Sequence, residues 1–156
     1  MTVKMGELDV VSDARRLKTV LGSCVGVILH DPGRRVSGLA HVILPARQRG
    51  DTASGKYADT AIPALVARIV GSGGRRRFLE AQLVGGAQMF PQGASTIASI
   101  GEQNVRAARG ILGRLSIPVV FEDIGGQAGR TVIFDNATGR VSVKTLRAME
   151  VKEDSR

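Results

Sequence analysis

A pair of apolar segments joined by a short turn constrains the fold of this chain more than any other feature. Residues 25–30 (VGVILH) and 35–44 (RVSGLAHVIL) are rich in branched aliphatic side chains, and Asp31-Pro32-Gly33 lies between them. This pattern predicts two neighbouring strands. A third β-rich segment, residues 16–21, comes before them, across a tight turn at Gly22-Ser23-Cys24.

Two helices and four further strands are expected in the rest of the chain. The first helix should begin near Asp59 or Thr60, because Pro63 then falls in a first turn whose amides need no helical partner. A capping-box pattern at Ser99 and Glu102 marks the start of the second. The expected elements are a polar loop at 46–56, a helix from about 59 to the glycines at 71–74, a strand at 79–84, a helix at about 100–115, and strands at 117–122, 130–134 and 140–146.

The order of these elements predicts the fold class. About seven strands and two helices follow one another as strands, helix, strand, helix, strands, which is not the alternation of a doubly wound sheet. We expect an α/β fold of the α+β kind: a layered sandwich of mixed or antiparallel sheet with the two helices packed outside. At 156 residues the chain suits a single domain, 1–156, in which 147–156 is a frayed charged tail.

The single cysteine, Cys24, excludes an intrachain disulfide and a zinc site made of several thiolates. No cluster of His, Asp or Glu has metal-ligand spacing, so neither a metal nor another cofactor is expected. The N-terminus lacks the apolar core of a signal peptide, and the longest apolar stretches are too short to span a bilayer. These features predict a cytoplasmic protein without membrane insertion.

The formal net charge of +8 favours an acidic partner without naming it. Nucleic acid is a poor candidate, because aromatic residues make up only 3% of the chain and hardly interleave with the arginines. An arginine-rich, solvated surface is the plainer interpretation of the charge.

Cys24 is the first candidate for chemistry. A lone cytosolic cysteine is more often an inert small hydrophobe. Here, however, the turn Gly22-Ser23-Cys24 precedes an apolar strand and can hold the sulfur at the end of the sheet, where backbone amides of Gly22 and Ser23 could bind a developing oxyanion. Among the glycine-rich segments, which match no phosphate-binding motif, Gly85 and Gly86 are expected to line the site.

A thiol needs a base to become a nucleophile at neutral pH. His41 lies inside the apolar segment GLAHVIL. A histidine satisfied within the core is one interpretation, but pairing of neighbouring strands would bring its imidazole within reach of Cys24. His30, beside the turn, is expected to face solvent. The candidates for a third group that orients the imidazole are Thr19, Ser23 and the loop containing Asp123.

Six segments of the chain appear in an order that a known family shares. They are TVLGSCVGVILHD at 19–31, GLAHVILP at 38–45, GKYADTAI at 55–62, GGAQMF at 85–90, IGEQNV at 100–105 and DIGGQAGR at 123–130. Together they resemble the chemoreceptor glutamine deamidases, the CheD family, over roughly residues 5 to 146. The combination of LGSCV with AHVILP is the specific part of this resemblance.

The resemblance implies an activity and a set of residues. Members hydrolyse selected glutamine side chains of methyl-accepting chemotaxis receptors to glutamate and release ammonia. The family's cysteine and histidine fall on Cys24 and His41, and its threonine falls on Thr19, next to Lys18. Gln103 departs from the family pattern, in which an arginine is expected, and this leaves any site role of that position open.

The resemblance also implies a fold like the catalytic domain of glutamine-deamidating bacterial toxins. Some members bind a chemotaxis phosphatase of the CheC type, which is therefore a candidate partner. Two other functions stay open. A transamidase would form the same thioester and pass it to an amine. A non-catalytic module would only regulate the phosphatase, although the intact Cys24 and His41 argue against it.

Overall fold

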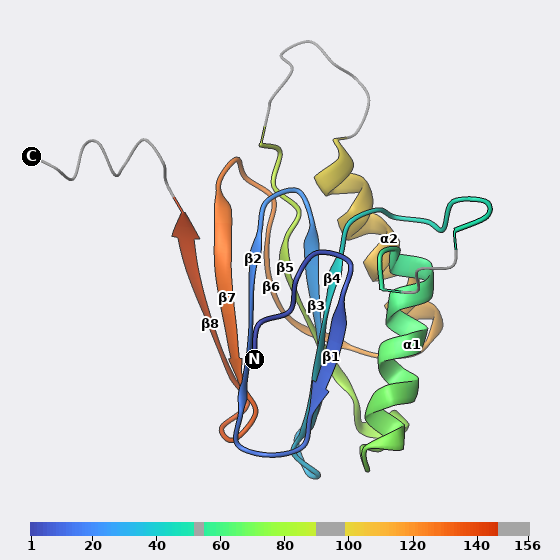
Figure 1. The fold of residues 1–156 in the computed structure, drawn as a ribbon, viewed down its shortest axis with the longest axis vertical. Helices are drawn as coiled ribbons and strands as arrows, with labels where there is room; N and C mark the ends of the chain where they lie inside the picture. Colours follow the sequence, from blue (N-terminus) through green and yellow to red (C-terminus); the bar gives the residue numbers. More distant parts are fainter. Residues whose placement is uncertain (52–54, 90–98, 147–156) are drawn as a thin grey trace, which may run out of the picture.

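The computed structural model describes residues 1–51, 55–89 and 99–146, which form three layers (Figure 1). A three-stranded sheet, a five-stranded sheet and a pair of helices lie side by side in that order. The layered α+β sandwich predicted from the order of the elements is therefore confirmed. No helix within the described ranges is long and apolar enough to cross a membrane.

The two sheets differ in their strand pairing. The strands are β1 Leu8–Val11, β2 Arg16–Leu21, β3 Val25–Asp31, β4 Val36–Val42, β5 Glu80–Gly85, β6 Val119–Ile124, β7 Gly129–Asp135 and β8 Arg140–Leu146; the helices are α1 Ala58–Gly71 and α2 Ile100–Arg114, with a 3-10 turn, η1, at Arg76–Phe78. The larger sheet has the order β1-β4-β3-β5-β6, and the smaller has the order β2-β7-β8. Among the strands of the described residues, only β5 and β6 pair in parallel, because α2 supplies the crossover that parallel neighbours require.

The predicted hairpin forms the centre of the molecule. Every residue of β3 and β4 is buried, since the helices cover one face of the larger sheet and the smaller sheet covers the other. Val27 and Leu29 belong to the core under the helices, whereas Ile28 and Leu39 belong to the core between the sheets. Because successive side chains of a strand point to opposite faces of the sheet, neighbouring residues of β3 lie in two separate cores.

Several boundaries differ from the sequence prediction. The strand β1 was not predicted, and its four residues are too few for a clear pattern. The helix α1 begins at Ala58, so Pro63 lies beyond the first turn. Proline has no N–H to donate to the carbonyl of Asp59, four residues earlier, but Asp59 is an exposed residue. The predicted N-cap at Ser99 is confirmed, because the Glu102 N–H donates to Ser99 Oγ over 3.2 Å. Residues 52–54 of the polar loop, Phe90 and the tail at 147–156 lie outside the described residues.

The prediction that His30 faces solvent is wrong. Its residue is only 6% exposed, and its ring lies edge-on to Phe134 of β7, with the ring centroids 5.0 Å apart. The neighbouring Asp31 is also buried and forms an ion pair with Arg75 over 3.0 Å. The turn after β3 looked exposed because nothing local in the sequence shows that the second sheet covers this end of the strand.

Candidate active site

Cys24 directly precedes β3, at the end of the larger sheet. Its residue is 9% exposed, and its side chain belongs to the core between the two sheets, together with Leu21 and Leu39. The thiol therefore lies at the boundary of an aliphatic core and keeps a small exposed area. The other face of the larger sheet, under the helices, is formed by different side chains.

His41 lies on β4, diagonally opposite Cys24. The register pairs Gly26 with His41, and Cys24 stands two residues before Gly26. Directly paired residues share a face, and a Cβ on Gly26 would meet Leu21 and Leu39, which belong to the same core as Cys24. The sulfur and the imidazole therefore leave the sheet on the same side, above a glycine that has no side chain to separate them.

Thr19, on β2 of the smaller sheet, completes a chain of contacts with His41. Its hydroxyl lies 2.7 Å from His41 Nδ1 and 2.6 Å from the carbonyl oxygen of Val3. A carbonyl can only accept, so the one hydroxyl proton goes to Val3, and Nδ1 must carry the proton that Thr19 accepts. In the neutral imidazole, Nε2 is then the unprotonated nitrogen that can take a proton from a thiol.

Burial determines the protonation of this group in the free protein. It raises the pKa of the Cys24 thiol, although the residue's own backbone N–H partly offsets the effect. Burial also lowers the pKa of His41, and the Val3 carbonyl partly opposes this. Both shifts favour a neutral thiol and a neutral imidazole at neutral pH. Such a pair supports attack by the thiol with simultaneous loss of its proton to His41.

The segment that begins with the two glycines expected to line the site is hydrogen-bonded to the turn Gly22-Ser23-Cys24, called the nucleophile turn below after its proposed role. The Gly86 N–H donates to the carbonyl of Cys24 over 2.9 Å, and the Ala87 N–H donates to the carbonyl of Gly22 over 3.0 Å. Gly85 has φ +105°, and a Cβ there would lie 2.4 Å from the Cys24 carbonyl oxygen. Because its amide is already bonded, Gly86 supports the turn and does not offer an N–H to an oxyanion.

The loop containing Asp123 is linked to Gly85 through Arg130. Arg130, only 6% exposed, donates from Nη1 to the carbonyls of Gly85 (2.9 Å) and Asp123 (2.7 Å), and from Nη2 to that of Gly125. The Asp123 carboxylate lies 3.7 Å from Arg130 Nε. Of the three candidates for the group that orients His41, only Thr19 contacts the imidazole within the described ranges.

Sequence reasoning missed Asn104. Its residue is completely buried on α2, and its amide donates to the carbonyls of Ser23 (3.1 Å) and Ile43 (2.9 Å). A polar residue on the apolar face of a predicted helix was the available signal. The neighbouring Gln103, which departs from the family pattern, is partly exposed.

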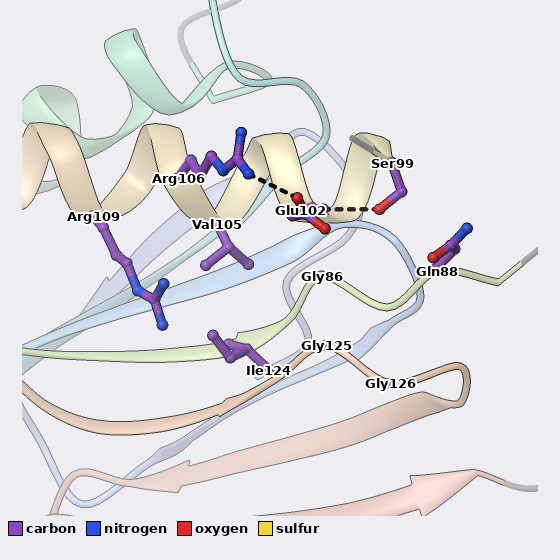
Figure 2. A pocket seen from close by; sticks show the side chains of 10 residues that line it. All are labelled: Gly86, Gln88, Ser99, Glu102, Val105, Arg106, Arg109, Ile124, Gly125 and Gly126. Carbon is purple, nitrogen blue, oxygen red and sulfur yellow. Dashed lines mark hydrogen bonds and ion pairs between the residues drawn. The ribbon is translucent and has the colours of Figure 1, made fainter. Parts of the chain in front are cut away.

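A cavity of about 340 Å³ opens beside this turn, on the other face of the sheet (Figure 2). Gly86, Gly125 and the side chains of Val105 and Arg109 are among its lining residues. Val105 belongs to the core under the helices, whereas Cys24 belongs to the core between the sheets. The cavity is therefore a neighbour of the thiol site and does not contain it. Among the described residues, no group of three or more His, Cys, Asp or Glu could hold a metal ion.

The chain matches proteins of known family over nearly its whole length. A family model described as "CheD chemotactic sensory transduction" matches residues 43–145. A probable chemoreceptor glutamine deamidase CheD of Geobacillus kaustophilus is 47% identical, over 97% of this chain and 96% of its own. Its counterpart in Methanococcus vannielii is 41% identical over 97% of each chain. The chemoreceptor glutamine deamidase CheD of Halalkalibacterium halodurans is 40% identical over 95% of this chain and 94% of its own.

Among solved structures, a hypothetical protein of Bacillus licheniformis, YfiH, aligns with 77% of this chain and 49% of its own at 14% identity, with a TM-score of 0.48. This likeness is too distant to support an argument. The sequence relatives cover nearly the whole chain at 40% identity or more, including both segments that carry Cys24 and His41. The chain belongs to the CheD family.

Proposed function

We propose that this protein is a chemoreceptor glutamine deamidase in which Cys24 is the nucleophile, His41 the proton carrier and Thr19 the group that orients His41. One observation carries the proposal: the 2.7 Å contact between Thr19 and His41 Nδ1 leaves Nε2 as the basic nitrogen of a buried imidazole beside the strand that follows Cys24. The names of the relatives at 40–47% identity support the substrate class.

The reaction has two halves. In the first, Nε2 of His41 takes the thiol proton while the Cys24 sulfur attacks the carboxamide carbon of a receptor glutamine. The tetrahedral intermediate collapses as the His41 imidazolium protonates the departing nitrogen, which leaves as ammonia, and a thioester remains. In the second half, His41 deprotonates a water molecule that attacks the thioester. The proton then returns to the sulfur, and glutamate is released.

Charge developing on the amide oxygen needs a donor during both halves. We assign this role to the N–H of Cys24, which also lowers the pKa of the residue's own thiol against the effect of burial. It donates to no other backbone carbonyl in the described part of the chain. The turn residues Gly22 and Ser23 complete the proposed oxyanion site.

The test is incubation of the protein with cytoplasmic fragments of chemotaxis receptors, followed by peptide mass spectrometry. We expect specific glutamines to become glutamates, and a folded Cys24→Ala variant to be inactive. Full activity of Cys24→Ala would reject the proposed nucleophile. A primary amine added to the same reaction separates the alternative: incorporation of the amine instead of conversion to glutamate would identify a transamidase.

A chemotaxis phosphatase of the CheC type is a further proposed partner. Because its proposed substrate and partner are chemotaxis proteins, we place the protein in the cytoplasm. Copurification of the two proteins, with deamidation measured in the presence and absence of the phosphatase, tests this part.

The net charge of +8 should also speed the encounter with acidic receptor helices. Receptor deamidation should then slow as salt is added.

A further inference from the structure

The side chain of Asn104 joins the chain segments that carry both proposed catalytic groups. Its Nδ2 has two protons, and the structure gives each an acceptor: the Ser23 carbonyl at 3.1 Å and the Ile43 carbonyl at 2.9 Å. Ser23 directly precedes Cys24, and Ile43 follows His41 by two residues. The regular pairing of β3 with β4 ends at Val25 and Val42, so Asn104 bridges the two strands just past the last ladder pair.

The contact with Ser23 also determines the direction of the Cys24 N–H. The Ser23 carbonyl and the Cys24 N–H belong to one planar, trans peptide unit, so they point in opposite directions. Holding the carbonyl against Asn104 on α2 therefore turns the N–H away from the helix. Cys24 belongs to the core between the sheets, on the face opposite the helices, so an N–H turned away from α2 points to the side of the sulfur.

Packing alone does not account for this residue. Asn104 is 0% exposed, and its Oδ1 has no hydrogen-bond donor among the described residues. A buried acceptor without a partner costs stability, and an apolar side chain of similar volume would avoid that cost. The two donated hydrogen bonds are thus the feature that only an amide supplies at this position.

We propose that Asn104 is a positioning residue of the active site, which orients the Ser23–Cys24 peptide so that its N–H meets the developing oxyanion. The inference rests on the proposed role of Cys24 as nucleophile. Asn104 itself contacts neither the sulfur nor the imidazole through any recorded hydrogen bond in the described residues; it acts through the peptide unit that it holds.

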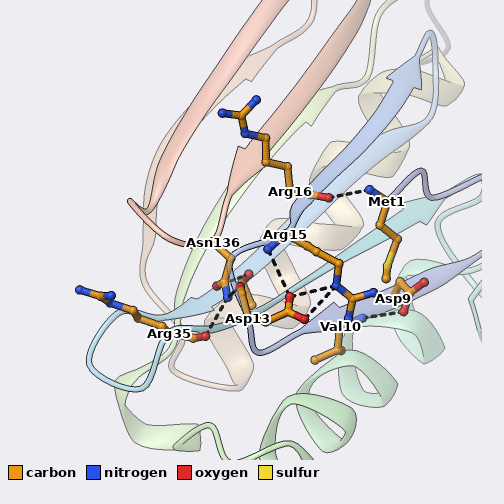
Figure 3. A network of polar contacts seen from close by, with 9 residues as sticks. Met1, Asp9, Val10, Asp13, Arg15, Arg16, Arg35 and Asn136 are labelled. Atoms are coloured by element: carbon orange, nitrogen blue, oxygen red, sulfur yellow. Dashed lines mark hydrogen bonds and ion pairs between the residues drawn. The ribbon is translucent and has the colours of Figure 1, made fainter.

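The chain contains a matched control. Asn136 is 1% exposed, and its Nδ2 also donates to two carbonyls, those of Asp13 (2.7 Å) and Arg35 (2.8 Å) (Figure 3). It follows β7 at the end that pairs with Arg16, whereas the opposite end of β7 pairs with Leu21, near the nucleophile turn. Its Oδ1 also accepts from Ser37 Oγ (2.7 Å), so replacing it should weaken the fold at least as much without touching Cys24.

The experiment compares Asn104→Leu with Asn136→Leu in the full chain. The first readout is the rate of Cys24 alkylation by iodoacetamide as a function of pH, which follows the thiolate and needs no receptor. We expect the alkylation curve of Asn104→Leu to move to higher pH by about half a unit or more, because the peptide N–H no longer favours the thiolate. The curve of Asn136→Leu should match that of the unmodified protein.

The second readout is deamidation of receptor fragments. Here kcat should fall at least about tenfold in Asn104→Leu with KM little changed, because an oxyanion donor acts on the transition state. An unchanged alkylation curve in Asn104→Leu, or an equal shift in Asn136→Leu, overturns the inference. If the unmodified protein deamidates nothing, the proposed function fails while the alkylation comparison still decides the role of Asn104. If Asn104→Leu does not fold, Asn104→Ser replaces it, because a serine hydroxyl cannot bond to both carbonyls. Its alkylation curve is then compared with that of the unmodified protein in the same way.

Discussion

Thr19 accepts a hydrogen bond from His41 Nδ1 across the space between the two sheets, with 2.7 Å between the hydroxyl oxygen and the ring nitrogen. The direction follows from the second contact of the hydroxyl, which donates to the Val3 carbonyl. A strand of the smaller sheet thereby selects the tautomer of a histidine on the larger sheet. The protonation state of the site depends on the docking of one sheet against the other.

Replacing Thr19 with valine should disable the site while keeping the shape of the side chain. The Nδ1–H and the Val3 carbonyl would lose their partner, which should cost about 1–3 kcal/mol of unfolding free energy. Receptor deamidation should fall at least about tenfold, because the imidazole is no longer held in one tautomer. Thr19→Ser keeps the hydroxyl and should recover most of the rate. Equal rates for the valine and serine variants would remove Thr19 from the mechanism.

The pH dependence of activity should reflect a neutral resting pair. Burial lowers the pKa of His41 below its ordinary 6.5, so Nε2 stays available as a base at pH 6.5 and is lost only at lower pH. Deamidation measured as kcat/KM should therefore hold steady from pH 8 down to about 6.5 and fall below it. Because burial raises the pKa of the Cys24 thiol, alkylation of the free protein should keep rising above pH 8. An alkylation plateau already at pH 6 would instead indicate a thiolate–imidazolium pair.

His30 should make the fold sensitive to mild acid. Burial lowers its pKa from 6.5, while Glu80 and Asp31 oppose the shift. The unfolded chain then binds the proton more readily than the folded one, so stability is complete above pH 6.5 and declines as the pH falls below it, by at most about 1.4 kcal/mol per pH unit for one histidine. His41 acts in the same direction. His30→Leu should make the decline between pH 7 and 5 shallower in urea unfolding; identical slopes in the two proteins would contradict this.

Two glycines should respond in opposite directions to the same substitution. At Gly85, alanine would need a positive φ and would place Cβ 2.4 Å from the Cys24 carbonyl oxygen, so Gly85→Ala should lose more than about 1 kcal/mol of stability and displace the nucleophile turn. At Gly110, on the exposed side of α2, nothing lies within 4 Å of an added Cβ. Gly110→Ala should gain about 0.5–1 kcal/mol. Urea unfolding of both variants measures the contrast, and loss of stability at Gly110 would refute it.

Local pattern was sufficient for most of the elements and pointed to two candidate reactive residues. The hairpin of β3 and β4 follows from its apolar segments and turn, and the start of α2 follows from Ser99 and Glu102. Cys24 and His41 stood out because the chain has one cysteine and few histidines, and the family resemblance added Thr19. The strand β1 could not be predicted, because its four residues are too few to show an alternation of apolar and polar side chains.

The sequence by itself determined which side chains are available and which strands alternate, because both properties are local. Only the tertiary structure decided that His30 is buried, that Thr19 rather than Ser23 or Asp123 meets His41, and that Asn104 joins the ends of two strands. Each of these relations joins residues more than twenty positions apart or depends on a second sheet covering the first. The periodicity of apolar residues predicts which face of a strand a residue occupies, whereas the packing of the layers determines which residue it contacts on that face.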